Sequence, residues 1–113
     1  MSLERGRLST VVQVAAGSTV GIMTVVNNKK VYIKSIIAHG VGINTFPTAQ
    51  VYYVPNGSSA DVNNRIFDVT LSAKETVLLE PSYPIVLTET GDKLFVGVGN
   101  SAINFIIMGD KEA

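Results

Sequence analysis

The sequence contains no cysteine, no tryptophan and only one histidine among its 113 residues. The absence of cysteine excludes disulfide bonds and thiolate chemistry, and it leaves the redox compartment open. His39 alone cannot supply the two or three imidazole ligands of typical zinc and copper sites, so we expect it to be a structural or surface residue. The chain also lacks a Gly-x-Ser-x-Gly motif and a visible orienting partner for His39, so it gives no sign of nucleophilic catalysis. We therefore expect no enzyme, no metal site and no cofactor.

Charged residues are also scarce, at 16% of the chain, and nine basic residues balance nine acidic ones. Because no run of Lys or Arg could concentrate phosphates or anionic lipids, we expect no nucleic-acid partner and no membrane partner. No apolar stretch approaches the roughly 20 residues of a membrane-spanning helix. Met1–Thr10 are not followed by the apolar region of a signal peptide. We expect a soluble protein that is made in the cytoplasm.

The acidic residues mostly flank turns or predicted strand ends, where charged side chains commonly stay solvated. The residues concerned are Asp61, Asp68, Glu75, Glu80, Glu89 and Asp92. Solvation explains them better than the paired carboxylates of a glycosidase would. The loop that holds Asp61, Asn63 and Asn64 offers oxygen ligands, which leaves a calcium site as a minor alternative. The spaced ligand set and the closing glutamate of an EF-hand are missing there.

Hydrophobic residues make up 46% of the chain, and turn-forming residues divide them into runs of strand length. These runs are rich in Val, Ile, Thr, Tyr and Phe, and several alternate with a period of two, as in Leu94, Val96 and Val98. The predicted strands are residues 9–15, 19–26, 30–39, 49–54, 65–71, 75–80, 84–88, 93–98 and 102–108. Short, regularly spaced strands predict an all-β fold, an antiparallel β-sandwich of jelly-roll-like arrangement with eight to nine strands and little or no helix.

Alternation also predicts which side chains face the interior of the sandwich. The candidates are Val20, Ile22, Val31, Ile33, Ile36, Val51, Tyr53, Phe67, Val69, Leu71, Val77, Leu79, Val86, Leu94, Val96, Val98, Ile103, Phe105 and Ile107. Between two of the predicted strands, Asn27 and Asn28 occupy positions where a positive φ is often required. We expect a hairpin with a tight corner at these two residues.

Two segments are expected to lie outside the regular strands. Residues 55–64 are the most polar stretch of the chain and are predicted to form an exposed, mobile loop. Residues 1–8 come before any alternation and are predicted to form an N-terminal arm, either frayed or ordered on a neighbouring subunit. The single β-sandwich domain is then expected to span residues 9–113.

The order of several segments carries a resemblance. An opening strand ends in Val14-Ala-Ala-Gly17, and it is followed by a strand from Lys30 to Ile37 and by Val51-Tyr-Tyr-Val-Pro-Asn-Gly57. The later segments are Asn64-Arg-Ile66, Thr70–Thr76 and Glu89–Leu94, which lead into the last two strands. In this order the chain resembles small β-sandwich virion proteins of tailed bacteriophages over roughly residues 10 to 109. The shared pattern is one of strands and turns, and it contains no catalytic motif.

This resemblance implies a non-enzymatic structural role on a phage particle, in a virion assembled from proteins made in the host cytoplasm. The first expectation is a capsid cement (decoration) protein that forms a homotrimer, binds the major capsid protein or another virion protein, and stabilises the particle. A tail, neck or baseplate component is the alternative within the same class. The neutral net charge and the apolar excess suit either role, because they allow large interfaces to be buried at modest desolvation cost.

If the protein is a trimer, strands or loops near the subunit axis should contribute apolar side chains. We expect Ile43, Phe46, Val62 and Tyr83 to do so, because they lie in turn regions where a monomer gains least from them.

A carbohydrate-binding β-sandwich module is the main alternative from another class of function. Tyr32, Tyr52, Tyr53 and Tyr83 could offer ring faces to a sugar. Against this, tryptophan is absent, and tyrosines beside Val and Ile are more often half-buried sheet residues.

Overall fold

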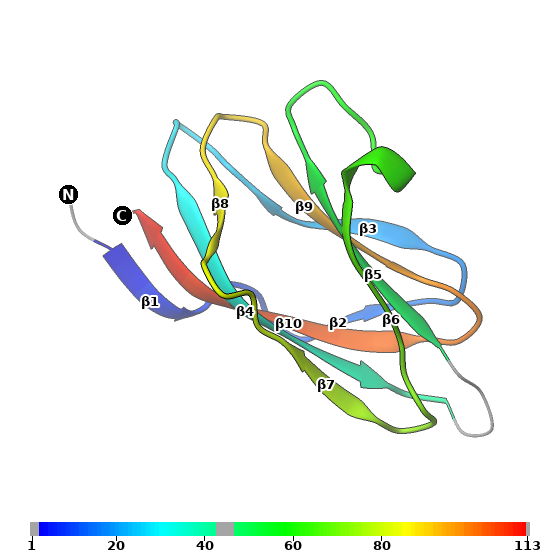
Figure 1. Cartoon of the computed structure of the whole chain (residues 1–113). Helices are drawn as coiled ribbons and strands as arrows, with labels where there is room; N and C mark the ends of the chain where they lie inside the picture. Colours follow the sequence, from blue (N-terminus) through cyan, green and yellow to red (C-terminus); the bar gives the residue numbers. More distant parts are fainter. Residues whose placement is uncertain (1–2, 43–46, 113) are drawn as a thin grey trace.

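Two antiparallel sheets packed face to face make up the structure (Figure 1). A computed structural model describes residues 3–42 and 47–112. The six-stranded sheet has the order β1-β10-β4-β7, with β2 also paired to β10 and β8 also paired to β4. Its strands are β1 (Leu3–Arg7), β2 (Val12–Val14), β4 (Val31–Gly40), β7 (Thr76–Leu79), β8 (Ile85–Leu87) and β10 (Ile103–Glu112). The four-stranded sheet has the order β3-β9-β5-β6, and its strands are β3 (Thr19–Thr24), β5 (Thr48–Val54), β6 (Arg65–Thr70) and β9 (Lys93–Val98).

Helix is nearly absent, as predicted. Within residues 3–42 and 47–112 it is limited to one short 3-10 helix, η1 (Val62–Asn64), in the connection between β5 and β6. None of the helical structure in these ranges is long and apolar enough to cross a membrane. The predicted antiparallel β-sandwich is thus confirmed, with ten strands among the described residues in place of the predicted eight or nine.

The core lies between the sheets and is filled from every second position of the long strands. In β10, the side chains of Ile103, Phe105 and Ile107 are fully buried, while Leu94 and Val96 of β9 face them from the other sheet. Removing one large apolar side chain from water contributes about 1.5–3 kcal/mol to folding. Burial of the side chains that the period-two pattern places inside therefore makes the main contribution to the stability of the fold.

All nine predicted strands correspond to strands of the structure, from β2 through β10. The last one is longer than predicted and runs on to Glu112. Residues 1–8, predicted as an arm, contain β1, which pairs antiparallel with the C-terminal half of β10 from Leu3 opposite Glu112 to Arg7 opposite Met108.

Two of the predicted inward residues, Val20 and Val86, neither belong to the core nor pack against it. Val20 pairs with Val96 and so lies on the inner side of its sheet, but β3 is an edge strand and leaves the Val20 side chain 38% exposed. The prediction for β8 is wrong by one position, because Leu87 and not its neighbour Val86 is buried in the core. The core also contains residues that the pattern missed, namely Val14, Val25, Ala38, Ala49 and Leu87.

The predicted tight corner is confirmed at Asn27 and Asn28, both of which have φ 52°. The turn closes with a hydrogen bond from the Lys29 amide to the Val26 carbonyl at 3.0 Å. It does not join a hairpin, however, because β3 and β4 on its two sides belong to different sheets. The two left-handed residues let the chain reverse abruptly from one layer of the sandwich to the other.

Candidate assembly surface

A row of apolar side chains crosses the outer face of the six-stranded sheet. Leu78 of β7 pairs in register with Ile37 of β4, and Ile37 in turn pairs with Ile106 of β10. The Leu78 side chain is 53% exposed, and Ile37 and Ile106 are half-buried. We call these three residues the outer row.

Strand alternation explains why the outer row points away from the core. Ile36 and Ala38 are both fully buried, so Ile37 between them must face outward. Ile106 likewise stands between two fully buried residues of β10. Apolar surface that a partner buries here would contribute about 25 cal/mol per Å² to the free energy of association. An exposed apolar row on a sheet face is therefore a candidate contact with another protein.

Two polar side chains on the strands that carry the outer row, His39 and Lys34, have partners within the chain. His39 Nδ1 lies 2.8 Å from the Thr76 hydroxyl, which agrees with the structural or surface role expected for this histidine. Lys34 Nζ forms an ion pair with the nearly buried Asp110 carboxylate at 2.7 Å. Covering this face with another subunit would thus not leave the Lys34 charge without a partner.

Of the four predicted interface residues, the structure describes Val62 and Tyr83, which lie in connections of different sheets. Ile43 and Phe46 lie outside the described residues. Val62 is 68% exposed on η1, in a connection of the four-stranded sheet. Tyr83 is 84% exposed between β7 and β8, in a connection of the six-stranded sheet. The outer row was missed by sequence reasoning, because alternation leaves Ile37 and Ile106 outside the predicted core but does not show that the register sets them beside Leu78.

One end of the sandwich is held together by a buried carboxylate. Asp92 is only 5% exposed, and it accepts hydrogen bonds from the backbone amides of Asn56 and Glu89, each at 3.1 Å. The Tyr53 hydroxyl donates to it at 3.4 Å. Asp92 therefore ties the connection after β5 to the connection before β9. The prediction that Asp92 is solvated is wrong, although the other acidic residues named with it are exposed.

This environment changes how the two ionisable side chains titrate. Burial alone would raise the pKa of Asp92, but hydrogen bonds from the Glu89 and Asn56 amides outweigh burial and hold that pKa below its ordinary value. Burial, followed by the charge of Asp92, raises the pKa of Tyr53. The lowered pKa keeps Asp92 as a carboxylate that accepts hydrogen bonds, and the raised pKa keeps Tyr53 as a phenol that donates one. The two side chains therefore have a structural role.

The loop considered for calcium uses its oxygen atoms within the chain. The Asp61 carboxylate accepts a hydrogen bond from the Asn63 amide at 2.7 Å, and the Asn64 side chain accepts one from the Asp61 amide at 3.0 Å. These two bonds form a capping box at the start of η1. Across the part of the chain that the structure describes, no cluster of three or more His, Cys, Asp or Glu could hold a metal ion.

The four tyrosines do not form a common platform for a sugar. Tyr52 is 6% exposed, on the outer side of its sheet beneath the Arg65 guanidinium, which lies 5.7 Å from the ring centre. Tyr53, the next residue of β5, faces the core. Tyr32 lies on the other sheet, and the exposed Tyr83 lies in a connection between strands.

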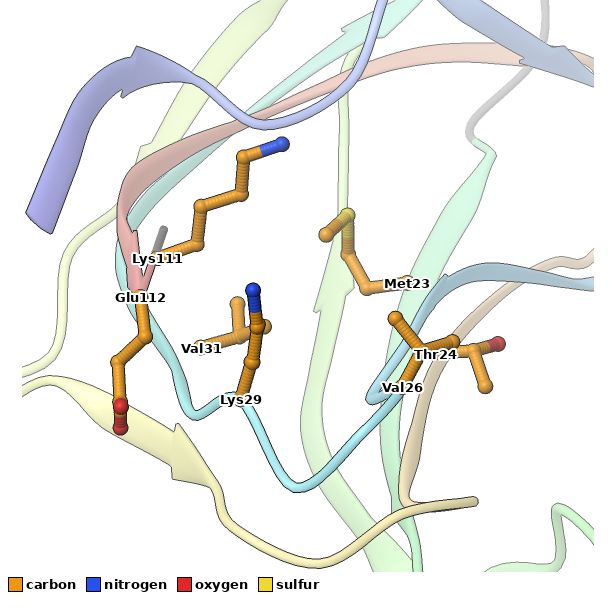
Figure 2. A pocket seen from close by; sticks show the side chains of 7 residues that line it. All are labelled: Met23, Thr24, Val26, Lys29, Val31, Lys111 and Glu112. Carbon is orange, nitrogen blue, oxygen red and sulfur yellow. The ribbon is translucent and has the colours of Figure 1, made fainter.

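A cavity of about 280 Å³ opens between the end of β10 and the turn that follows β3 (Figure 2). Its apolar part comes from Met23, Val26 and Val31, and charged side chains such as Lys29 stand around it. The lining contains neither a paired acid and base nor an activated nucleophile. The cavity is therefore a gap between strand ends that has no visible catalytic chemistry.

No family model and no curated protein matches the chain. Solved structures do match it. A chain in the structure of infectious bursal disease virus Gx strain aligns with a TM-score of 0.51 and 13% sequence identity, over 98% of this chain and 32% of that one. A virus structure thus contains the same fold. A chain of the Gt strain of the same virus aligns with a TM-score of 0.46 and 9% identity, over 97% of this chain and 32% of that one.

The chain therefore spans about a third of the length of these viral chains, 32% in each case. At 13% identity the likeness to the Gx strain structure shows the β-sandwich fold alone. Neither of the two structures is of a tailed bacteriophage.

Proposed function

We propose that the protein is a non-enzymatic structural component of a virus particle, and that it works by packing its sandwich against other copies and against the particle. The observation that carries this proposal is the outer row, an exposed apolar feature on a face whose nearby charge is already paired. The shared fold with a chain from a virus structure supports it.

The finer form of the proposal follows the sequence resemblance to phage virion proteins. In this form the chain is a capsid cement protein of a tailed bacteriophage, associates as a homotrimer, and binds the major capsid protein. A tail, neck or baseplate component would use the same surface. The exposed Val62 and Tyr83 are proposed as further contact residues.

Sugar binding is less well supported. Carbohydrate modules present stacked aromatic rings on one surface, whereas Tyr52 and Tyr53 face opposite sides of one sheet. Retardation on a glycan gel by a protein that remains monomeric would favour this alternative over the structural role.

The first test is the solution mass by light scattering across a dilution series. A stable species near three times 12.0 kDa would support the trimer. Leu78→Ser should weaken association about tenfold or more, because each buried Leu is worth about 1.5–3 kcal/mol. Ile66→Ser is the matched control, since Ile66 is also an exposed strand residue, 42% exposed, but lies on the other sheet.

The two variants distinguish association through the outer row from non-specific association through any exposed apolar side chain. Equal weakening by both substitutions would contradict the outer row as the contact. A monomer at every concentration would contradict self-association, and with it the trimer.

A further inference from the structure

The N-terminal strand β1 is attached to the sandwich through one neighbour. It pairs with β10 and shares no substantial contact with any other element of the described chain. Figure 1 shows β1 beside the C-terminal end of β10, at the edge of the six-stranded sheet. Removing β1 would therefore uncover the edge of β10 and leave the packing between the two sheets in place.

The pairing between β1 and β10 has a defined register. Glu4 stands opposite Lys111, and Arg5 stands opposite Asp110. A shift by one residue would place residues of like charge opposite each other, which is unfavourable in antiparallel strands. The edge of β10 is therefore complementary to this particular segment in both backbone pairing and charge order.

The connection between β1 and β2 is short and is anchored to β10. β1 and β2 both pair with β10, and residues 8–11 lie between them. Ile107 anchors this connection, because its carbonyl accepts the Leu8 amide at 2.7 Å and its amide donates to the Ser9 hydroxyl at 3.1 Å. Leu8 also packs against the core. The chain can thus swing away before Leu8 while β2 and the core stay fixed.

The balance between pairing within a chain and pairing between chains is close. Ordering the five residues of β1 costs conformational entropy, and the hydrogen bonds between β1 and β10 offset this cost whether the two strands belong to one chain or to two. A second copy offers the same β10 edge with the same register, so exchange loses none of these bonds. Dilute protein favours the internal pairing, and the high local concentration of an assembly favours exchange.

We propose that Leu3–Arg7 of one copy pairs with residues 108–112 of β10 in a second copy when the protein assembles. The partner is a second copy of this chain, and the exchanged strand links neighbouring subunits. This inference rests on the proposed function, because it requires self-association.

Single cysteines test the exchange directly, since the chain has no cysteine of its own. Directly opposite residues of antiparallel strands have Cα atoms about 4.5–5.5 Å apart, which a disulfide can span. Arg7→Cys and Met108→Cys are made on separate chains, co-refolded at up to about 1 mM and oxidised. Exchange predicts a mixed disulfide dimer near twice 12.0 kDa that increases with concentration. The chain carrying both substitutions should form an internal disulfide when dilute.

Thr48→Cys and Thr70→Cys are the matched control pair, because these residues stand opposite each other on β5 and β6 inside the four-stranded sheet. Separate chains carrying them should give no mixed dimer. The exchange is overturned if Arg7→Cys and Met108→Cys chains form no more mixed dimer than the control, or if the chain with both substitutions forms no internal disulfide.

Light scattering on the same samples separates this failure from failure of the proposed function. Oligomers without mixed disulfides would overturn exchange and leave self-association standing. Monomers without mixed disulfides would overturn both.

Discussion

The carboxylate of Asp92 accepts a hydrogen bond from the backbone amide of Asn56 at 3.1 Å, although the two residues are 36 positions apart in the chain. The bond joins the loops at the ends of β5 and β8 through a group that is almost fully buried. A buried carboxylate is tolerated only when donors surround it, and here two amides and a phenol do so. Asp92 is therefore expected to be the most sensitive polar residue of the fold.

Asp92→Ala should lower the free energy of unfolding by about 3 kcal/mol, because it leaves buried donors without an acceptor. Urea denaturation followed by circular dichroism measures this. Asp68→Ala is the control: Asp68 also forms a close contact, an ion pair with Arg65 at 2.8 Å, but it is exposed. Its loss should cost less than about 1 kcal/mol. Equal effects of the two substitutions would contradict the role assigned to Asp92.

The pH dependence of stability should report the same carboxylate. Folding lowers the pKa of Asp92 from its ordinary value of 3.8, so its contribution is fully present above that pH and is lost as the pH falls through the folded pKa. Unfolding of the wild-type protein and of Asp92→Asn should be compared from about pH 7 down to about pH 2. The stability advantage of the wild type should shrink below about pH 4. A constant difference across this range would show that Asp92 does not titrate with folding.

The sequence was sufficient to predict where the strands lie along the chain, but not how they pair in the sheets. The period of two in β9 and β10 correctly identifies the buried set, because alternation is a local property of extended chain. Val20 follows the same pattern and is still exposed, since being at the edge of a sheet depends on which strands pair. β1 was not predicted as a strand, because its charged sequence has no alternation and only the edge of β10 makes it extended.

The outer row could not be predicted from the sequence for a related reason. Ile37 and Ile106 become a surface feature only when the register sets them beside Leu78, and no local signal contains the register. The burial of Asp92 likewise depends on an amide from a distant loop. Long-range pairing thus decides both the outer row and the buried carboxylate.

The corner between β3 and β4 should depend on backbone conformation at Asn27. This residue has φ 52°, a left-handed conformation that Asn tolerates and Ala does not. Asn27→Ala should therefore lower stability by about 1 kcal/mol, whereas Asn27→Gly should stay within about 0.5 kcal/mol of the wild type. Thermal unfolding of the three proteins gives the comparison. A glycine variant as unstable as the alanine variant would indicate that the side chain of Asn27 matters more than its φ.

The close approach of two strands at Gly109 should be the strictest steric requirement of the six-stranded sheet. Gly109 lies at a register irregularity where β10 passes β4, and a Cβ there would collide with the backbone carbonyl oxygen of Tyr32. The strands would have to separate, so Gly109→Ala should cost about 3 kcal/mol or prevent folding.

Gly99→Ala is the matched control for this prediction, because its Cβ would meet Thr48 at an ordinary distance of 3.5 Å. It should change stability by less than about 1 kcal/mol. The yield of folded protein and its midpoint in urea measure both variants. The atoms that this Cβ would meet belong to Tyr32 and Lys34 of β4, so a folded Gly109→Ala protein should have weaker pairing between β10 and β4. Hydrogen exchange should then be faster at the β4 amides beside Gly109 in this variant than in Gly99→Ala, and equal protection of these amides in the two proteins would contradict the steric argument.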